Sequence, residues 1–194
     1  MHALRDGTFW DEAGAVEEAM IRCRSVLASD PASTRAVTEL VRAHALLEAS
    51  FDTVWGTLTD YDHLAEFIPG LRSSRVVERK GGSLVVEQEG EARFLFFTYP
   101  IAVTLLATAR RPSAIDVRVL KGNLRRLDGG YRLERVDAGK IALRWVGLIE
   151  PEALPPLLGV LVMRANIEDQ FTGMVREIER RESARRGRPG AMPR

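Results

Sequence analysis

Six short strand-like segments follow one another between residues 75 and 149, and a single long helical segment comes after them. Turn-forming residues such as Gly81-Gly82 and Asp137-Ala138-Gly139 separate the segments. Short turns join only antiparallel neighbours, because a parallel pair needs a crossover of a dozen or more residues. The pattern therefore predicts an α+β fold built on an antiparallel meander. The predicted strands span residues 75–80, 84–97, 101–110, 115–121, 131–136 and 141–149, and the other predicted turns are Tyr99-Pro100, Arg111-Pro112-Ser113 and Asp128-Gly129-Gly130.

The last helical segment begins after Pro155-Pro156 and is predicted to end near Arg181. Apolar residues recur along it at helical spacing, which gives the helix one buried face. Its first half differs, because apolar residues surround the helix between Leu157 and Met163. We expect protein to cover that half on more than one side.

Two short helices are predicted upstream of the meander. Ser50 is suited to cap the first helix, whose apolar face starts at Phe51. A second helical turn at residues 63–67 ends at Pro69-Gly70. Residues 36–49 precede both helices and suit a first strand, although their Ala, Leu and Glu content leaves a helix open.

Several motifs in these segments match one known family pattern. They are Val54-Trp55, Asp60-Tyr61-Asp62 and Phe67-Ile68-Pro69 in the short helices, Gly122-Asn123-Leu124 with Leu127 and Tyr131 late in the meander, and Pro151–Pro156 before the last helix. Over roughly residues 36–181 the chain resembles the START/Bet v 1-like (SRPBCC) superfamily, in particular its polyketide cyclase/dehydrase and coenzyme-Q-binding branch. The resemblance implies a helix-grip fold: a curved antiparallel β-sheet wrapped around a long C-terminal helix, with two short helices after strand 1. It also implies an elongated cavity, and members bind lipids, sterols, quinones or polyketides while only some are enzymes.

The predicted domain organisation has three parts. Residues 1–35 form an extension with an amphipathic helix at residues 11–29, residues 36–182 form the START/Bet v 1-like ligand-binding domain, and residues 183–194 form a flexible basic tail. The whole chain has a net charge of +1, whereas residues 180–194 hold six Arg and one Glu. Nucleic acid is therefore not the expected partner, and transient contact of the tail with an anionic membrane stays open.

The single cysteine, Cys23, excludes an intrachain disulfide and a multi-cysteine metal site. Residues 1–11 have no apolar stretch of the kind that a secretory signal needs. No segment supplies the roughly 20 consecutive apolar residues of a membrane-spanning helix. We therefore expect a cytoplasmic protein.

A curved sheet does not close completely around a helix, so inward-facing residues are expected to line a gap that buries a hydrophobic ligand. Two strand sets, Ile101 with Val103 and Leu105 and Ile141 with Leu143 and Trp145, are taken as facing inward. A register slip of one residue would reverse both sets. The candidate ligand-binding residues are Tyr61, His63, Phe67 and Ile68 at the cavity mouth, Gln88, Val103, Leu105, Tyr131 and Trp145 on the strands, and Leu161, Arg164, Ile167 and Phe171 on the last helix.

Four of these residues also have a plainer interpretation. Trp145 suits core packing as well as a cavity wall, and Tyr131 suits the sheet edge as well as a ligand contact. His63 fits a surface or gate position better than a catalytic one. Arg164 fits a side chain that buries its stem and keeps its charge in water better than an anion clamp.

The sequence contains no self-contained catalytic constellation, cofactor motif or metal-ligand spacing. The leading prediction is a binding or carrier protein for a hydrophobic small molecule, such as a lipid, quinone or polyketide, without a cofactor. An aromatase/cyclase-like enzyme is the alternative, in which Tyr131, Gln88 or Arg164 polarises substrate carbonyls. A protein- or ribosome-interaction module is a second alternative, because one branch of the resembled superfamily acts on ribosomes.

Overall fold

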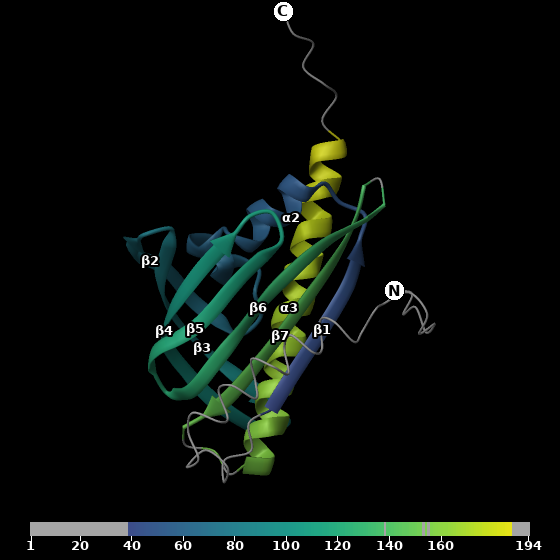
Figure 1. Cartoon of the computed structure of the whole chain (residues 1–194). Coiled ribbons are helices and arrows are strands. Elements are labelled where there is room, and N and C mark those ends of the chain that lie inside the picture. Colours follow the sequence, from purple (N-terminus) through teal and green to yellow (C-terminus); the bar gives the residue numbers. More distant parts are fainter. Residues whose placement is uncertain (1–38, 138, 153, 155, 188–194) are drawn as a thin grey trace, which may run out of the picture. The chain divides into compact units, whose positions relative to one another are not determined.

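The computed structural model describes residues 39–137, 139–152, 154 and 156–187 (Figure 1). The predicted N-terminal helix at residues 11–29, the linker at 30–35 and Cys23 lie outside these residues, as do residues 188–194 of the predicted tail. Within the described part of the chain, no helix is both long enough and apolar enough to cross a membrane.

One antiparallel sheet accounts for all seven strands in the described residues. Its strand order is β1-β7-β6-β5-β4-β3-β2, so β2 to β7 form the predicted meander and β1 adds to its far end. Residues 39–47, which lie in the segment for which a helix was left open, thus form the first strand. The strands are β1 (Glu39–Leu47), β2 (Leu71–Lys80), β3 (Ser83–Phe94), β4 (Phe97–Arg110), β5 (Ala114–Gly122), β6 (Leu124–Asp137) and β7 (Lys140–Pro151).

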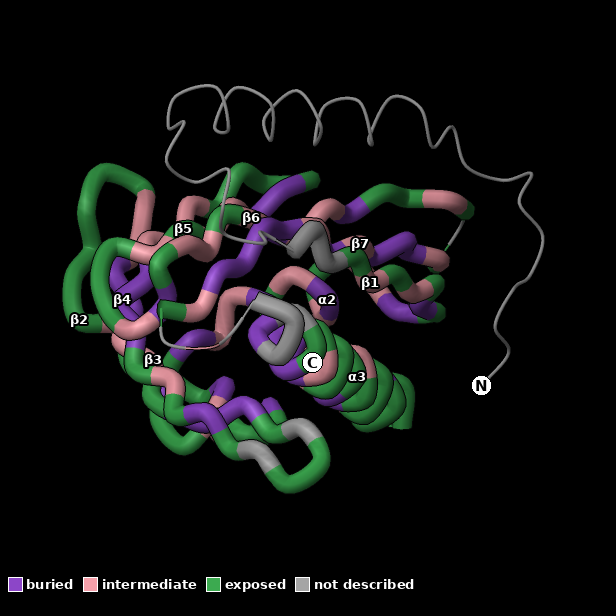
Figure 2. The backbone as a smooth tube through the Cα atoms, turned by 90° about the horizontal axis from the view of Figure 1, so that it is seen from below, coloured by how far each residue is buried: buried purple, intermediate pink, exposed green. Residues whose placement is uncertain are grey.

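Three helices accompany the sheet in the described part. The short helices are α2 (Phe51–Leu58) and the 3₁₀ helix η2 (Tyr61–Glu66), and the long one is α3 (Pro156–Arg186). Ser50 caps α2 as predicted, because its hydroxyl accepts a hydrogen bond from the Thr53 amide at 3.2 Å. Viewed roughly along α3, the sheet curves around the helix (Figure 2). The predicted α+β helix-grip fold is confirmed.

Two of the predicted turns lie instead inside strands. Tyr99-Pro100 belongs to β4, and the preceding turn is Leu95-Phe96. Strand β5 pairs with β4 only from Val103 onward, so Pro100 has a strand neighbour on one side only, where Pro is tolerated.

The second misplaced turn is Asp128-Gly129-Gly130, which lies within β6. The turn before β6 is at Gly122-Asn123, where Gly122 has a positive φ of 128°. Gly129 sits directly opposite Gly147 of β7. A Cβ at Gly129 would lie 2.6 Å from the Gly147 Cα, so this glycine permits a close approach between strands rather than a change of direction.

Helix α3 ends five residues later than predicted, at Arg186 rather than Arg181. Arg185 and Arg186, expected in the flexible tail, are helical and pair with Glu182 at 2.6 and 3.0 Å. The carboxylate of Glu182 is buried and also accepts hydrogen bonds from the Ser50 amide and the Thr53 hydroxyl. These contacts hold the last turns of α3 against the start of α2.

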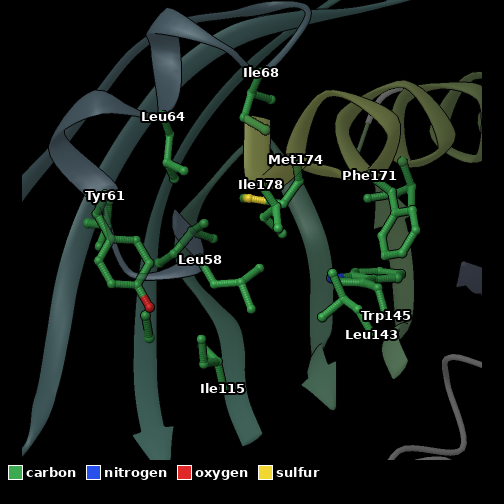
Figure 3. Packing of buried hydrophobic residues seen from close by; sticks show 14 of the residues in the cluster. Leu58, Tyr61, Leu64, Ile68, Ile115, Leu143, Trp145, Phe171, Met174 and Ile178 are labelled. Atoms are coloured by element: carbon green, nitrogen blue, oxygen red, sulfur yellow. The ribbon is translucent and has the colours of Figure 1, made fainter. Parts of the chain in front are cut away.

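The hydrophobic core fills the space between α3 and the concave face of the sheet. Figure 3 shows side chains from both short-helix and long-helix segments converging there, with Leu58 and Leu64 on one side and Met174 and Ile178 on the other. Leu143 of β7 and Ile178 of α3 are fully enclosed. The core leaves one region of this space unfilled, and that region is the candidate site.

Candidate ligand-binding cavity

A cavity of about 130 Å³ lies between α3, the short helices and the concave face of the sheet. Most of its wall is aliphatic. The strands contribute Leu71, Val86, Gln88, Ile101, Val103, Leu105, Ala107, Ile115, Val117, Leu124, Leu127, Gly129, Tyr131, Trp145 and Ile149; the helices and the loop after η2 contribute Leu58, Tyr61, Leu64, Ile68, Met163, Asn166, Ile167, Gln170 and Met174.

The inward-facing strand residues are those that the alternation predicted. Ile101, Val103 and Leu105 all line the cavity, and Trp145 lines it from β7. Ile141 and Leu143 lie in the buried core beside it. The register of both strands therefore agrees with the sequence pattern, since a slip of one residue would have turned these side chains outward.

Trp145 lies against two glycines, Gly147 of its own strand and Gly129 of the neighbouring strand β6. A Cβ on Gly147 would come 2.8 Å from the indole Cζ2 atom, and one on Gly129 would come 3.3 Å from the same atom. Only residues without a side chain leave room for the ring at this position. The glycine pair thus lets the indole form part of the cavity wall.

Tyr61 projects from the first residue of η2 into the space between sheet and helix (Figure 3). Its side chain is 8% exposed, and its hydroxyl is buried without a hydrogen-bond partner in the described structure. Burial raises the pKa of Tyr61 to about 12. The hydroxyl is therefore a neutral donor that an oxygen atom in the cavity would satisfy.

Tyr131 lines the same cavity from β6 rather than lying at a sheet edge. Burial and, to a lesser degree, the neighbouring Tyr61 raise the pKa of Tyr131 above its ordinary range. Both tyrosines are consequently protonated throughout the physiological range. They bring two phenolic hydroxyls to one apolar space.

Three amide side chains form the remaining polar wall. Gln88 donates a hydrogen bond to the Ser74 hydroxyl at 3.2 Å, and Gln170 donates one to the Asn166 side-chain oxygen at 2.9 Å. Gln88 was predicted, whereas Asn166 and Gln170 were not. The sequence held a signal for Gln170. It recurs at helical spacing with Met163, Ile167 and Met174, so these four residues lie on one stripe of the helix that lines the cavity.

The segment from Asp60 to Gly70, here called the cover, closes one end of the cavity with Tyr61, Leu64 and Ile68. It is fastened to α3 by Arg181, which donates to Asp60 at 2.9 Å and lies 5.3 Å from the Phe67 ring centre. Burial raises the pKa of Asp60, but hydrogen bonds from His63 and Arg181 outweigh this and hold that pKa below its usual range.

A glycine of α3 brings the helix close to the cover. A Cβ at Gly173 would lie 2.8 Å from the Phe67 carbonyl oxygen. The helix and the cover therefore pack backbone against backbone at this point. The ion pair and the close contact together hold the cover against α3.

The family model described as "Polyketide cyclase / dehydrase and lipid transport" matches residues 47–177, which is more than half of the chain. The chain belongs to this family. No protein of curated function matches the sequence.

Solved structures show the same fold as this polyketide cyclase/dehydrase family member. The Zhui aromatase/cyclase from Streptomyces sp. R1128 has a TM-score of 0.65 and 17% identity, over 76% of this chain and 95% of that one. TTHA0849 from Thermus thermophilus has a TM-score of 0.61 and 16% identity, over 72% and 97%. A START superfamily protein from Mycobacterium smegmatis has a TM-score of 0.56 and 11% identity, over 75% and 97%. The predicted superfamily is therefore confirmed.

Three predicted site residues of this family member lie away from the cavity. The side chain of His63 is 58% exposed and contacts Asp60 at 2.6 Å, and that of Arg164 is 64% exposed and pairs with Glu168 at 2.9 Å. Leu161 is 40% exposed. Positions 161, 164 and 168 share the solvent-facing stripe of α3, so the Arg164 side chain lies on the helix surface, as its plainer interpretation has it, and does not enter the cavity as an anion clamp.

Two further predicted residues lie in the structure without lining the cavity. Phe67 packs beneath Arg181 on the cover, and Phe171 is buried in the core. The remaining predicted residues, Tyr61, Ile68, Gln88, Val103, Leu105, Tyr131, Trp145 and Ile167, all contribute to the cavity wall. Within the described residues, no group of three His, Cys, Asp or Glu side chains is arranged to hold a metal ion.

Proposed function

We propose that the protein binds or carries a hydrophobic small molecule that bears a carbonyl or hydroxyl oxygen. The observation that carries this proposal is the buried Tyr61 hydroxyl, which has no partner in the described structure and lies at a cavity with an aliphatic wall. A buried donor left without a hydrogen bond costs roughly 1–3 kcal/mol. A ligand oxygen in the cavity would recover that free energy.

The size and lining of the cavity narrow the class of ligand. An apolar cavity of roughly 150 Å³ accommodates a benzene molecule. The volume of about 130 Å³ therefore suits a single ring or a short acyl chain. A lipid, quinone or polyketide would place one such portion inside, and a longer molecule would need the cover to move.

The chemistry of the wall favours a container over an acid–base enzyme. The described lining residues include no Asp, Glu, His, Lys, Arg or Cys, and the tyrosines have raised pKa values. A general acid or base works best when its pKa lies near the working pH. The two hydroxyls are instead suited to donate hydrogen bonds to a bound oxygen.

An aromatase/cyclase-like activity is the second candidate function. It is supported by the fold shared with an aromatase/cyclase and by the two tyrosines beside one cavity. In that case Tyr61 and Tyr131 would stabilise negative charge that develops on a substrate carbonyl, with Gln88 as a further donor. Arg164 would take no part, because its side chain lies outside on the surface of α3.

The proposal is tested with two probes of similar shape, acetophenone and isopropylbenzene, of which only the first has a carbonyl oxygen. We expect acetophenone to bind more tightly by about 1 kcal/mol, or roughly fivefold, in ligand-observed NMR titrations. Tyr61→Phe should remove this preference. Tyr99→Phe is the matched control, since its hydroxyl already bonds to the Asn123 carbonyl at 2.7 Å. Equal binding of the two probes, or a preference that survives in Tyr61→Phe, contradicts the proposal.

The natural ligand is sought separately. Native mass spectrometry of the purified protein, followed by organic extraction, should reveal a bound apolar molecule that contains oxygen. Turnover of a poly-β-keto substrate that falls in both Tyr61→Phe and Tyr131→Phe, but not in Tyr99→Phe, would favour the second candidate function instead.

A further inference from the structure

The turn between β3 and β4 exposes two large hydrophobic side chains next to each other. Leu95 is 81% exposed and Phe96 is 85% exposed. The other exposed large hydrophobic residues in the described structure, such as Leu46 and Leu120, are between 40% and 49% exposed. Single exposed hydrophobic residues are ordinary, but an adjacent pair at the end of a hairpin indicates a contact surface. In Figure 2 the turn is the exposed loop at the lower edge.

The backbone of this turn is unfavourable for the residue it holds. Leu95 has a φ of 53°, in the left-handed region that favours glycine or asparagine. Phe94 pairs with Phe97, so Leu95 and Phe96 form a two-residue hairpin turn. Here the leucine carries backbone strain while its side chain gains no burial within the chain. Folding alone does not explain why a leucine occupies the position.

Two arginines lie at the base of this turn. The side chains of Arg72 and Arg93 are 68% and 74% exposed, and both pair with the carboxylate of Glu91, which is 8% exposed. One buried negative charge therefore orients two exposed guanidinium groups, and the base has a net charge of +1. Guanidinium groups bind phosphate oxygens in a bidentate manner.

We propose that this turn is a docking site for an anionic lipid bilayer, with Leu95 and Phe96 among the acyl chains and Arg72 and Arg93 at the phosphates. Arg93 lies two residues before Leu95, or about 7 Å along the strand. That separation matches the roughly 5–10 Å to which interfacial apolar residues enter a membrane. The apolar tip would thus lie at the depth of the acyl chains, and the arginines behind it would lie at the depth of the phosphates.

The same hairpin is bonded to the cover of the cavity. The Glu91 amide donates to the Gly70 carbonyl at 2.8 Å, and Gly90 pairs with Leu71, a cavity-lining residue. Gly90 is five residues from Leu95, or about 17 Å in an extended strand. Docking would hold the cover close to the lipid surface, where a hydrophobic ligand partitions. This consequence rests on the proposed function, whereas docking itself does not.

Co-sedimentation with vesicles tests the proposal. The wild-type protein is expected to bind vesicles of phosphatidylglycerol and phosphatidylcholine, and the double variant Leu95→Ser/Phe96→Ser to bind them at least tenfold more weakly. The matched control Leu46→Ser/Leu120→Ser removes two exposed leucines elsewhere and should keep full binding. Each of Arg72→Gln and Arg93→Gln should weaken binding to these vesicles about fivefold and change binding to pure phosphatidylcholine little.

An insertion measurement separates this site from the basic C-terminal residues, whose contact with an anionic membrane was left open above. The variant Phe96→Trp should gain a blue-shifted emission that doxyl-labelled lipids quench, and Leu120→Trp should not. The tip residues are exposed, so Leu95→Ser/Phe96→Ser should keep the wild-type melting temperature and the wild-type affinity for acetophenone.

Three results would overturn the proposal. The first is equal vesicle binding by the wild type and the tip double variant. The second is an unquenched Phe96→Trp. The third is a dimer in gel filtration that the double variant loses, without vesicle binding by the wild type, since the tip would then contact a second copy of the chain. Loss of acetophenone preference in Tyr61→Phe with no vesicle binding would leave the proposed function standing and reject only this inference.

Discussion

Two buried polar groups in this protein have opposite surroundings. Glu182, near the end of α3, is 3% exposed and accepts hydrogen bonds from the Ser50 amide, the Thr53 hydroxyl, Arg185 and Arg186. Tyr61, at the cavity, is 8% exposed and its hydroxyl has no partner in the described structure. Glu182 joins α3 to the start of α2, whereas the Tyr61 hydroxyl lies at the cavity without a hydrogen bond.

The difference separates a structural role from a binding role. A buried polar group that is fully bonded stabilises the fold, and one that is not bonded destabilises it. Glu182 therefore explains why α3 is held against α2. The Tyr61 hydroxyl has no comparable structural role in the described residues. Its burial is explained if a ligand oxygen accepts its hydrogen bond. The predictions below alter each side of this comparison in turn.

The largest effect on the free energy of unfolding is expected at Glu182, near the end of α3. Glu182→Ala leaves the Ser50 amide and the Thr53 hydroxyl without their acceptor and should lower the free energy of unfolding by about 2–3 kcal/mol. Glu168→Ala is the control, because its pair with Arg164 is exposed and contributes about 0.5 kcal/mol or less. Urea denaturation measures both. Similar losses for the two variants would mean that burial of Glu182 has no special effect.

A smaller effect is expected at the wall of the cavity. Gly147→Ala would place a methyl group against the Trp145 indole and push the ring into the free volume, at a cost of about 1–2 kcal/mol. The displaced ring should also abolish acetophenone binding. Gly56→Ala is the control, since nothing lies within 4 Å of its Cβ position and alanine favours the helix by up to about 1 kcal/mol. Retained acetophenone affinity in Gly147→Ala would show that the indole does not border the ligand.

The contribution of Glu177 in α3 to the free energy of unfolding should depend on pH. A hydrogen bond from Arg180, and then one from Arg181, lowers the pKa of Glu177 to about 2, against burial that raises it. Its contribution is complete above the unfolded pKa near 4.5 and is lost as the pH falls toward 2. Glu177→Gln should therefore cost about 1 kcal/mol at pH 7 and less at pH 3, because its partners are partly exposed. Thermal unfolding at both pH values checks this, and a pH-independent difference would contradict it.

Much of the fold was predictable because local chemistry and strand alternation agree. Gly81-Gly82 and Arg111-Pro112-Ser113 are turns in the structure, and the alternation of Ile101, Val103 and Leu105 identified the inward face. Asp128-Gly129-Gly130 was misread as a turn, because Gly129 permits a close approach to β7 and Gly130 permits one to β5. That need exists only after β6 has paired with both neighbouring strands, so local sequence does not reveal it.

The polar wall of the cavity was harder to predict than its apolar wall. Tyr61 was a candidate because its segment was predicted to form the cavity mouth, and Gln88 and Tyr131 were candidates because of their positions on predicted strands. Arg164 was included as a candidate although a surface position was favoured, because a helix carries several stripes and the choice between them depends on how α3 is rotated against the sheet. Asn166 was overlooked for the same reason. The unbonded state of the Tyr61 hydroxyl is a tertiary property that no pattern in the sequence shows.

The most direct test of the central claim is the free energy of unfolding of the wild type and Tyr61→Phe, each measured with and without saturating acetophenone. Without acetophenone, the free energy of unfolding of Tyr61→Phe should equal that of the wild type or exceed it by up to about 1 kcal/mol, because the variant removes a buried hydroxyl that has no hydrogen bond. With the probe, the wild type should gain more stability than the variant. A variant that is less stable without the probe and gains equally from it would contradict the account, since the hydroxyl would then serve the fold rather than a ligand.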